Sequence, residues 1–203
     1  MKSEAALAVS YLRRTGQGDL YVGVPGGGAS RVHLPDDDAK ARFVTAVLKA
    51  KCEPGEELEL FGEPVAGLGG AARARLRRRV GALSPVVGLI TSLNLWENVS
   101  LAAAYHGSPP LERVAGIADD VLGAFGIEPR PFLARLPEDL APLEAKIAAL
   151  IRLLAVAPEL VLVDALEEGL SRAERPRAAL FESELRARLP AATLLFVDSR
   201  EES

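Results

Sequence analysis

The chain has 203 residues, of which 49% are hydrophobic and 26% are charged, and its formal net charge is −4 with a pI near 5.4. This negative balance excludes a general nucleic-acid binder, because no overall basic field is present to release counterions from a phosphate backbone. The single cysteine, Cys52, excludes a disulfide framework, and no apolar run reaches the length of a membrane span. We expect one soluble α/β domain, residues 1–203, in the cytoplasm.

The first part of the chain predicts two strands. Residues Ala5 to Leu12 and Asp19 to Val24 alternate in polarity, and Gly16 to Gly18 form a turn between them. The segment Pro25 to Gly28 is interpreted as a second turn, because a phosphate loop ends in Gly-Lys-Ser/Thr and leads into a helix. Here the next segment, Ser30 to Leu34, reads as a strand.

The residues after this strand have the layout of a phosphate loop without its chemistry. A strand, a short loop, Lys40 and a helical pattern follow one another, but Ala41 stands where the magnesium-binding Ser/Thr belongs. Three aspartates precede the lysine: Asp36, Asp37 and Asp38. Two negative charges 4 Å apart repel by roughly 4 kcal/mol at an effective dielectric constant of about 20. We therefore expect these aspartates to cap the helix in place of a nucleotide phosphate.

The middle of the chain contains a strand, Glu57 to Phe61, and a basic helix, Ala71 to Arg79. Solvent is the default environment of that helix, and lipid headgroups or an acidic partner are the alternative. A further strand, Val80 to Pro85, leads into the sequence GLITSLNLWENVSLAAAYHG, Gly88 to Gly107. His33 and His106 have no partners at metal-ligand spacing, so we expect no metal site.

The remaining elements alternate between helices and strands. The predicted elements are helices Leu111 to Phe125 and Glu144 to Leu154, the buried strand Leu160 to Val163, helix Arg172 to Arg188 and strand Thr193 to Val197. Asp164 closes the buried strand. The carboxyl end of such a strand is where nucleotide enzymes hold magnesium through a carboxylate.

The segment Ile151 to Leu154 (IRLL), followed by Leu160 to Ser171 (LVLVDALEEGLS), resembles the Walker B and D-loop region of ATP-binding cassette (ABC) ATPases. Element order and spacing extend the resemblance from about Val32 to Ser199. It implies an α/β fold with a P-loop NTPase-like (ABC ATPase) core, an N-terminal antiparallel β part and a helical subdomain at about 86–150.

The same resemblance implies that the groups which handle ATP have been replaced. The catalytic Glu of the family falls on Ala165, the switch His on Ser199, the Q-loop Gln on Pro85 and the D-loop Asp on Ser171. The LSGGQ signature falls on Leu140, Ala141, Pro142, Leu143 and Glu144. We expect no catalytic residues, no ATP or magnesium cofactor and an ATPase-inactive subunit. The alternative is a divergent ATPase that acts through Lys40 and Asp164.

The segment from Gly88 to Gly107 resembles ABC subunits of bacterial lipid transporters of the Mla type, in Glu97-Asn98-Val99 and Tyr105-His106-Gly107. In that family it forms the groove for the permease's coupling helix. The docking candidates are Leu89, Leu93, Leu95, Trp96 and Tyr105. The implied partners are a membrane permease, an active ABC ATPase subunit, or a second copy in a dimer, at the cytoplasmic side of the inner membrane. A stand-alone adaptor with no membrane partner is a further alternative.

Overall fold

The computed structural model describes residues 6–16, 18–106 and 109–200. The chain divides into two compact units, each made of segments that are distant in sequence. The first contains Met1–Ala82, Pro158–Asp164 and Ala191–Ser203, and the second contains Leu83–Ala157 and Ala165–Pro190. The expected helical subdomain at about 86–150 falls within the second unit.

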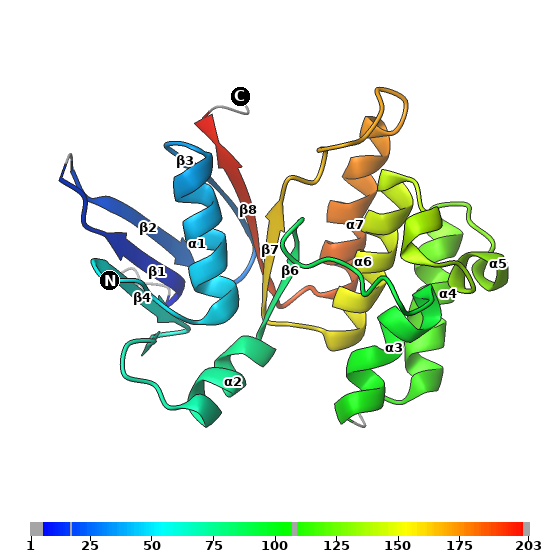
Figure 1. Cartoon of the computed structure of the whole chain (residues 1–203), viewed down its shortest axis with the longest axis horizontal. Helices are drawn as coiled ribbons and strands as arrows, with labels where there is room; N and C mark the ends of the chain where they lie inside the picture. Colours follow the sequence, from blue (N-terminus) through cyan, green and yellow to red (C-terminus); the bar gives the residue numbers. More distant parts are fainter. Residues whose placement is uncertain (1–5, 17, 107–108, 201–203) are drawn as a thin grey trace. The chain divides into compact units, whose positions relative to one another are not determined.

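An antiparallel sheet opens the first unit (Figure 1). Its strands are β1 (Leu7–Arg13), β2 (Leu20–Pro25), β4 (Glu56–Leu60) and β5 (Glu63–Pro64), in the order β2-β1-β4-β5. Tyr11 of β1 lies opposite Val22 of β2 and Leu58 of β4, and all three side chains are buried. The alternation that predicted the strands therefore places one face of the sheet in the core.

A parallel sheet forms the rest of the core of this unit. Its strands are β3 (Ala29–Leu34), β8 (Thr193–Ser199), β7 (Leu160–Asp164) and β6 (Val80–Leu83), in the order β3-β8-β7-β6. Strand β7 is buried along its whole length, as its continuous apolar run predicts. Asp164 lies opposite Val197, and Leu34 lies opposite Ser199, so the carboxyl ends of β3, β7 and β8 meet at one edge.

Two helices belong to the first unit, α1 (Asp37–Lys49) and α2 (Gly70–Arg78). Helix α1 contacts β3 and β8 of the parallel sheet and β4 of the antiparallel sheet. Its buried side chains Phe43, Val44 and Val47 recur at the spacing of one helix face. Because α1 begins directly after β3, its N-terminus lies at the edge where the parallel strands end (Figure 1).

The second unit is built from helices. They are α3 (Leu95–His106), α4 (Leu111–Ala124), α5 (Pro129–Leu133), α6 (Pro142–Val156) and α7 (Ala178–Arg188), with short 3₁₀ turns at Pro137–Asp139 and Arg175–Arg177. Helix α6 contacts α3, α4 and α7 through an apolar surface that includes Ile147, Leu150 and Ile151. Both sheets and this helical part confirm the predicted fold class.

One predicted helix is shorter than expected. The prediction of a single helix from Arg172 to Arg188 is wrong at its start, because a 3₁₀ turn occupies Arg175–Arg177 and α7 begins at Ala178. Pro176 has no N–H to donate and is tolerated only in the first turn of a helix. In addition, Glu174 accepts hydrogen bonds from the Ser171 backbone and hydroxyl, which hold the preceding residues in a turn.

Candidate functional site

The N-terminus of α1 is capped by the side chain of Asp36, the residue that precedes the helix. The Asp36 carboxylate accepts a hydrogen bond of 2.7 Å from the Ala39 N–H, with Asp36 in an extended N-cap conformation. Only Pro35 and Asp36 lie between the end of β3 and the start of α1. A phosphate cradle needs a longer glycine-rich loop whose N–H groups point inward. The capping role that the sequence predicts for Asp36 is therefore observed, and this segment is too short to wrap a phosphate.

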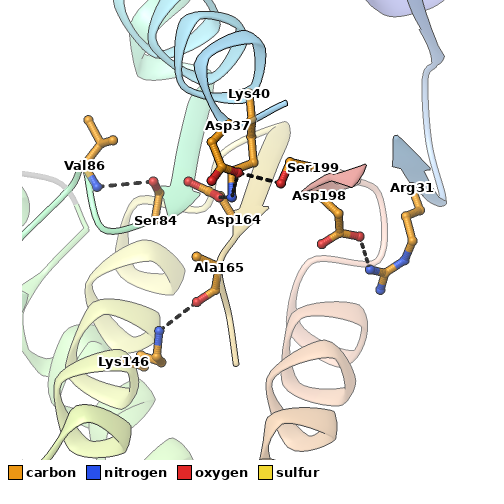
Figure 2. Close-up of polar contacts among 10 residues, drawn as sticks. All are labelled: Arg31, Asp37, Lys40, Ser84, Val86, Lys146, Asp164, Ala165, Asp198 and Ser199. Carbon is orange, nitrogen blue, oxygen red and sulfur yellow. Dashed lines mark hydrogen bonds and ion pairs between the residues drawn. The ribbon is translucent and has the colours of Figure 1, made fainter. Parts of the chain in front are cut away.

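Lys40, Asp37, Asp164 and Ser199, which we call the Lys40 cluster, meet at the edge where the parallel strands end (Figure 2). The Lys40 Nζ lies 3.4 Å from Asp164 Oδ1 and 4.0 Å from Asp37 Oδ1. The Ser199 hydroxyl donates a hydrogen bond of 2.5 Å to Asp37 Oδ1. Lys40 and Asp164 are 8% and 7% exposed, respectively. The structure thus brings together residues that sequence analysis placed in three separate motifs.

The charge of this cluster disfavours a nucleotide. Two carboxylates face one ammonium group, so the cluster carries a net negative charge when all three groups are ionised. A P-loop lysine binds phosphates as an unneutralised positive charge. Lys40 is instead already paired at close range with a buried carboxylate. The lysine, the helix N-terminus and the Asp164 carboxylate are thus all engaged in contacts within the chain.

The third aspartate of the run lies elsewhere. Asp38 Oδ2 accepts a hydrogen bond of 2.8 Å from Arg42 and lies 3.9 Å from Arg13 Nη1. This bond and the negative charge of Asp38 raise the pKa of Arg42 above its ordinary value. The cap expected of the three aspartates is therefore observed for Asp36, whereas Asp37 contacts Ser199 and Lys40 and Asp38 contacts Arg42. Ala41, the other position of the loop, contributes no side-chain oxygen.

The position of the catalytic carboxylate holds Ala165, which belongs to the second unit. Its backbone is left-handed, with φ of 53°, a conformation that costs a non-glycine residue about 1–2 kcal/mol. The Lys146 ammonium donates a hydrogen bond of 2.9 Å to the Ala165 carbonyl oxygen (Figure 2). Sequence analysis missed Lys146, because nothing in its local pattern distinguishes it from a surface lysine of α6.

The resemblance places the Q-loop at Pro85. Pro85 has no backbone N–H and no polar side chain, and it is exposed. Its neighbour Val86 donates its N–H to the Ser84 hydroxyl at 3.3 Å. This segment therefore offers no side-chain amide to a magnesium ion or to a phosphate.

The start of α6, where the resemblance places the signature motif, is also capped by a carboxylate. Glu144 Oε2 accepts a hydrogen bond of 2.8 Å from the Ala141 N–H, and Glu144 Oε1 accepts one of 2.6 Å from Arg135. The hydrogen bond from Arg135 and its positive charge lower the pKa of Glu144 below its ordinary value, against a smaller opposing effect of burial. Pro142 occupies the first helical position and donates nothing.

The rest of the signature region has no phosphate-binding chemistry. Leu143 is buried and Leu140 is half-buried. Sequence analysis predicted the loss of this motif but not the ion pair, because Arg135 lies in a separate turn of the chain.

The segment between β6 and α3 is held by two polar side chains. Arg152 donates to the carbonyl oxygens of Val87 and Gly88 at 2.7 and 2.9 Å. The buried Asn98 side chain accepts from the Ile90 N–H at 2.7 Å and donates to the Ile90 carbonyl oxygen at 3.0 Å. Burial lowers the pKa of Arg152 below its ordinary value. The segment is therefore a bonded loop that presents fixed side chains.

The predicted docking side chains lie on and beside this loop. Leu89, Leu93 and Trp96 are half-buried, and the Tyr105 side chain lies outside the described residues. Leu95 was expected to be exposed, but it is fully buried because it packs in the helical core at the start of α3. Among the large hydrophobic residues of this loop, Val86 and Ile90 have the most exposed side chains, at 58% and 42%. Sequence analysis missed both, although their position beside Pro85 and Leu89 could have indicated them.

Within residues 6–16, 18–106 and 109–200, no three His, Cys, Asp or Glu side chains lie close enough together to hold a metal ion. Over the same described ranges, no helix has the length and apolar character required to cross a membrane.

Several solved structures are similar to this chain in fold. A structure of cbiO1 from Clostridium perfringens, part of the ABC transporter complex cbiONQ, matches with a TM-score of 0.73 and 14% identity, covering 96% of this chain and 79% of that one. The fold is that of an ABC cassette. Two structures of the ATP-binding cassette MJ0796 match with TM-scores of 0.70 and 0.71, each at 19% identity, covering 95% of this chain and 86% of theirs. One of them is a dimer bound to ADP and Pi.

The sequence comparisons add no family assignment. No protein-family model and no curated protein sequence matches this chain. The ABC cassette fold is therefore established by structure, and the function is argued from the residues of this chain.

Proposed function

We propose that this chain is a pseudo-ATPase: an ABC-cassette subunit that does not bind or hydrolyse ATP and that acts as a structural or regulatory component of a bacterial ABC transporter. One observation carries the proposal. The two helix N-termini that correspond to the phosphate loop and the signature motif, those of α1 and α6, are each capped by a carboxylate of the chain itself. A phosphate would have to displace a bonded carboxylate at either position.

The Lys40 cluster supports the same conclusion. Lys40 is paired with Asp164 at 3.4 Å, so the lysine offers little attraction to a phosphate and the aspartate offers little to magnesium. Ala165 and Ser199 replace the groups expected to activate water and to stabilise the transferred phosphate. Without these groups, positioning and electrostatic stabilisation, which supply most of the catalysis of phosphoryl transfer, are both lost.

The test is an equilibrium titration of the purified chain with magnesium and ATP, in which binding is measured by calorimetry. We expect no saturable binding up to about 1 mM nucleotide. If ATP binds in the micromolar range, and Lys40→Ala weakens binding while Lys49→Ala does not, the proposal is wrong. Lys49 lies exposed at the other end of the same helix and is a matched control.

The second candidate function is a divergent but active ATPase that energises the transporter. The retention of Lys40 and Asp164 favours it, because P-loop enzymes bind phosphates through a lysine and magnesium through an aspartate. Release of phosphate from ATP by the wild-type chain, abolished in Asp164→Asn, would establish this alternative.

The proposed partner is a membrane permease of a lipid-type transporter, together with or instead of an active ABC ATPase subunit, at the cytoplasmic face of the inner membrane. The support is the resemblance of the Gly88 to Gly107 segment and the fixed apolar loop that presents Val86 and Ile90. An apolar helix of a partner binds to a surface of this chemistry.

Co-expression with a permease of a lipid-type transporter tests the partner. We expect the permease to co-purify with the wild-type chain and not with Val86→Glu or Ile90→Glu. Leu180→Glu is the control, because Leu180 is 37% exposed on α7 outside this loop. Loss of co-purification with all three variants, or with none, would contradict the proposed docking surface.

A further inference from the structure

Strand β2 is the terminal strand of the antiparallel sheet. Its one edge pairs with β1 from Leu20 to Pro25, and no other described segment donates a hydrogen bond to its opposite edge or accepts one from it. The N–H and C=O groups along such an edge are a template for another extended strand.

The side chains of β2 do not protect this edge. Its sequence, LYVGVP, contains no charged residue, whereas the interior strand β4, EELEL, places exposed Glu57 and Glu59 on the outer face of the sheet. Proteins that keep an edge strand solvated usually place charges or prolines along it. Pro25 stands only at the end of β2. The terminal strand β2 is therefore uncharged, whereas the interior strand β4 carries charges on its outer face.

The two faces of β2 differ in their exposure to solvent. Val22 and Val24 are buried in the core, and Tyr21 on the opposite face is 60% exposed. The Tyr21 ring lies along the strand over Gly23, where a Cβ on the glycine would stand 2.9 Å from the tyrosine hydroxyl oxygen. The outer face of β2 is thus an uncharged surface formed by the Tyr21 ring and a glycine.

We propose that β2 pairs antiparallel with β2 of a second copy of this chain, which joins two four-stranded sheets at a two-fold axis. In such an interface a residue near the middle of β2 lies opposite or diagonal to the same residue of its copy, so a charge there would lie close to an identical charge. The absence of charge from β2 meets this requirement. The pairing involves none of the residues of the proposed function and needs no nucleotide.

Charge-reversal variants at Tyr21 test the interface by sedimentation velocity of the full chain. We expect a dimer for the wild type, and dimer dissociation constants raised about tenfold or more for Tyr21→Lys and for Tyr21→Glu. Mixing the two variants restores the dimer, because opposite charges then meet across the axis. Raising the salt to about 1 M restores the dimer of Tyr21→Lys by screening. Neither treatment would restore a misfolded protein.

Glu59→Lys is the matched control, because it changes the charge of an exposed residue on the same face of the sheet but on an interior strand. It should leave the dimer unchanged. A wild-type chain that stays monomeric at about 100 μM would overturn the proposal. So would a dimer that persists in both Tyr21 variants, or variants that remain monomeric when mixed.

Discussion

Lys40 forms a buried ion pair with Asp164. It lies 3.4 Å from Asp164, and both side chains are buried. Breaking a buried ion pair by removing one partner costs about 3–5 kcal/mol, whereas replacing both partners by apolar groups of similar volume is often neutral. The removal of either partner alone should therefore destabilise the fold.

We expect Lys40→Met to lower the free energy of unfolding by about 3 kcal/mol, because it leaves the Asp164 carboxylate buried beside a thioether. The double variant Lys40→Met/Asp164→Leu should recover most of that loss. Urea denaturation of the wild type, both single variants and the double variant gives the coupling energy. Additive effects of the two substitutions would show that the pair has no structural role.

Glu144 gives a prediction about pH. Because the hydrogen bond and charge of Arg135 hold the pKa of Glu144 below its ordinary value of 4.5, the folded state binds this proton less readily than the unfolded state. Its contribution to stability is fully present above pH 4.5 and is lost as the pH falls from 4.5 through the lower folded-state pKa.

Glu144→Gln retains an acceptor for the Ala141 N–H and removes the charge. We expect the wild type to be more stable than this variant at neutral pH, with a difference that shrinks as the pH falls toward about 3. Urea midpoints measured across this range check the expectation. A difference that stays constant with pH would show that the charge of Glu144 is not responsible.

Sequence reasoning recovered the local contacts of the site and missed the distant ones. The cap formed by Asp36 joins residues three positions apart and follows from helix chemistry alone. Lys40 and Asp164 were found only through the resemblance of their motifs, and their pairing was not predicted. The bonds from Arg135 to Glu144 and from Lys146 to Ala165 join separate elements, so no spacing rule indicates them.

At the scale of elements, hydrogen bonds from polar side chains fix the conformation of a loop. The segment between β6 and α3 has little regular structure, yet Arg152 and Asn98 bond its carbonyl and N–H groups. Pro176 shows the reverse effect, because one residue without an N–H sets where α7 begins. Hydrophobic spacing predicted most helices and strands, but neither the loop anchors nor this helix start follow from hydrophobic spacing.

Arg152→Met tests the anchor. We expect a loss of about 1–3 kcal/mol, because the carbonyl oxygens of Val87 and Gly88 lose their donors in a partly buried position. Hydrogen exchange of the Val87 amide should accelerate, and that of the Ile90 amide, which Asn98 holds, should accelerate less. Arg152→Lys, which keeps the charge with fewer directed donors, should be intermediate. Unchanged exchange at Val87 would exclude an anchoring role.

At the scale of the whole molecule, neither compact unit is a continuous piece of chain. The first is made of three segments and the second of two, and β7 is inserted between α6 and the rest of the helical unit. If the helical unit unfolds, the segments that lead into β7 and β8 are no longer held in place. We therefore expect the two units to unfold together.

The sequence provides one natural probe for each unit. Trp96 is the only tryptophan and lies in the second unit, and Cys52 is the only cysteine and lies half-buried in the first. Tryptophan fluorescence and thiol labelling should give the same urea midpoint. Two separate midpoints would show that the units unfold independently.

The carboxylate caps of α1 and α6 have a consequence for the living cell. A helix terminus that takes its anion from solution is strengthened or weakened as the supply of that anion changes. Asp36 and Glu144 are residues of the chain, so these two caps do not depend on the concentration of any anion in solution. We therefore expect a subunit of the proposed kind to keep the same shape in a starved cell as in a well-fed one, and a partner assembled on it to stay assembled when nucleotide is scarce.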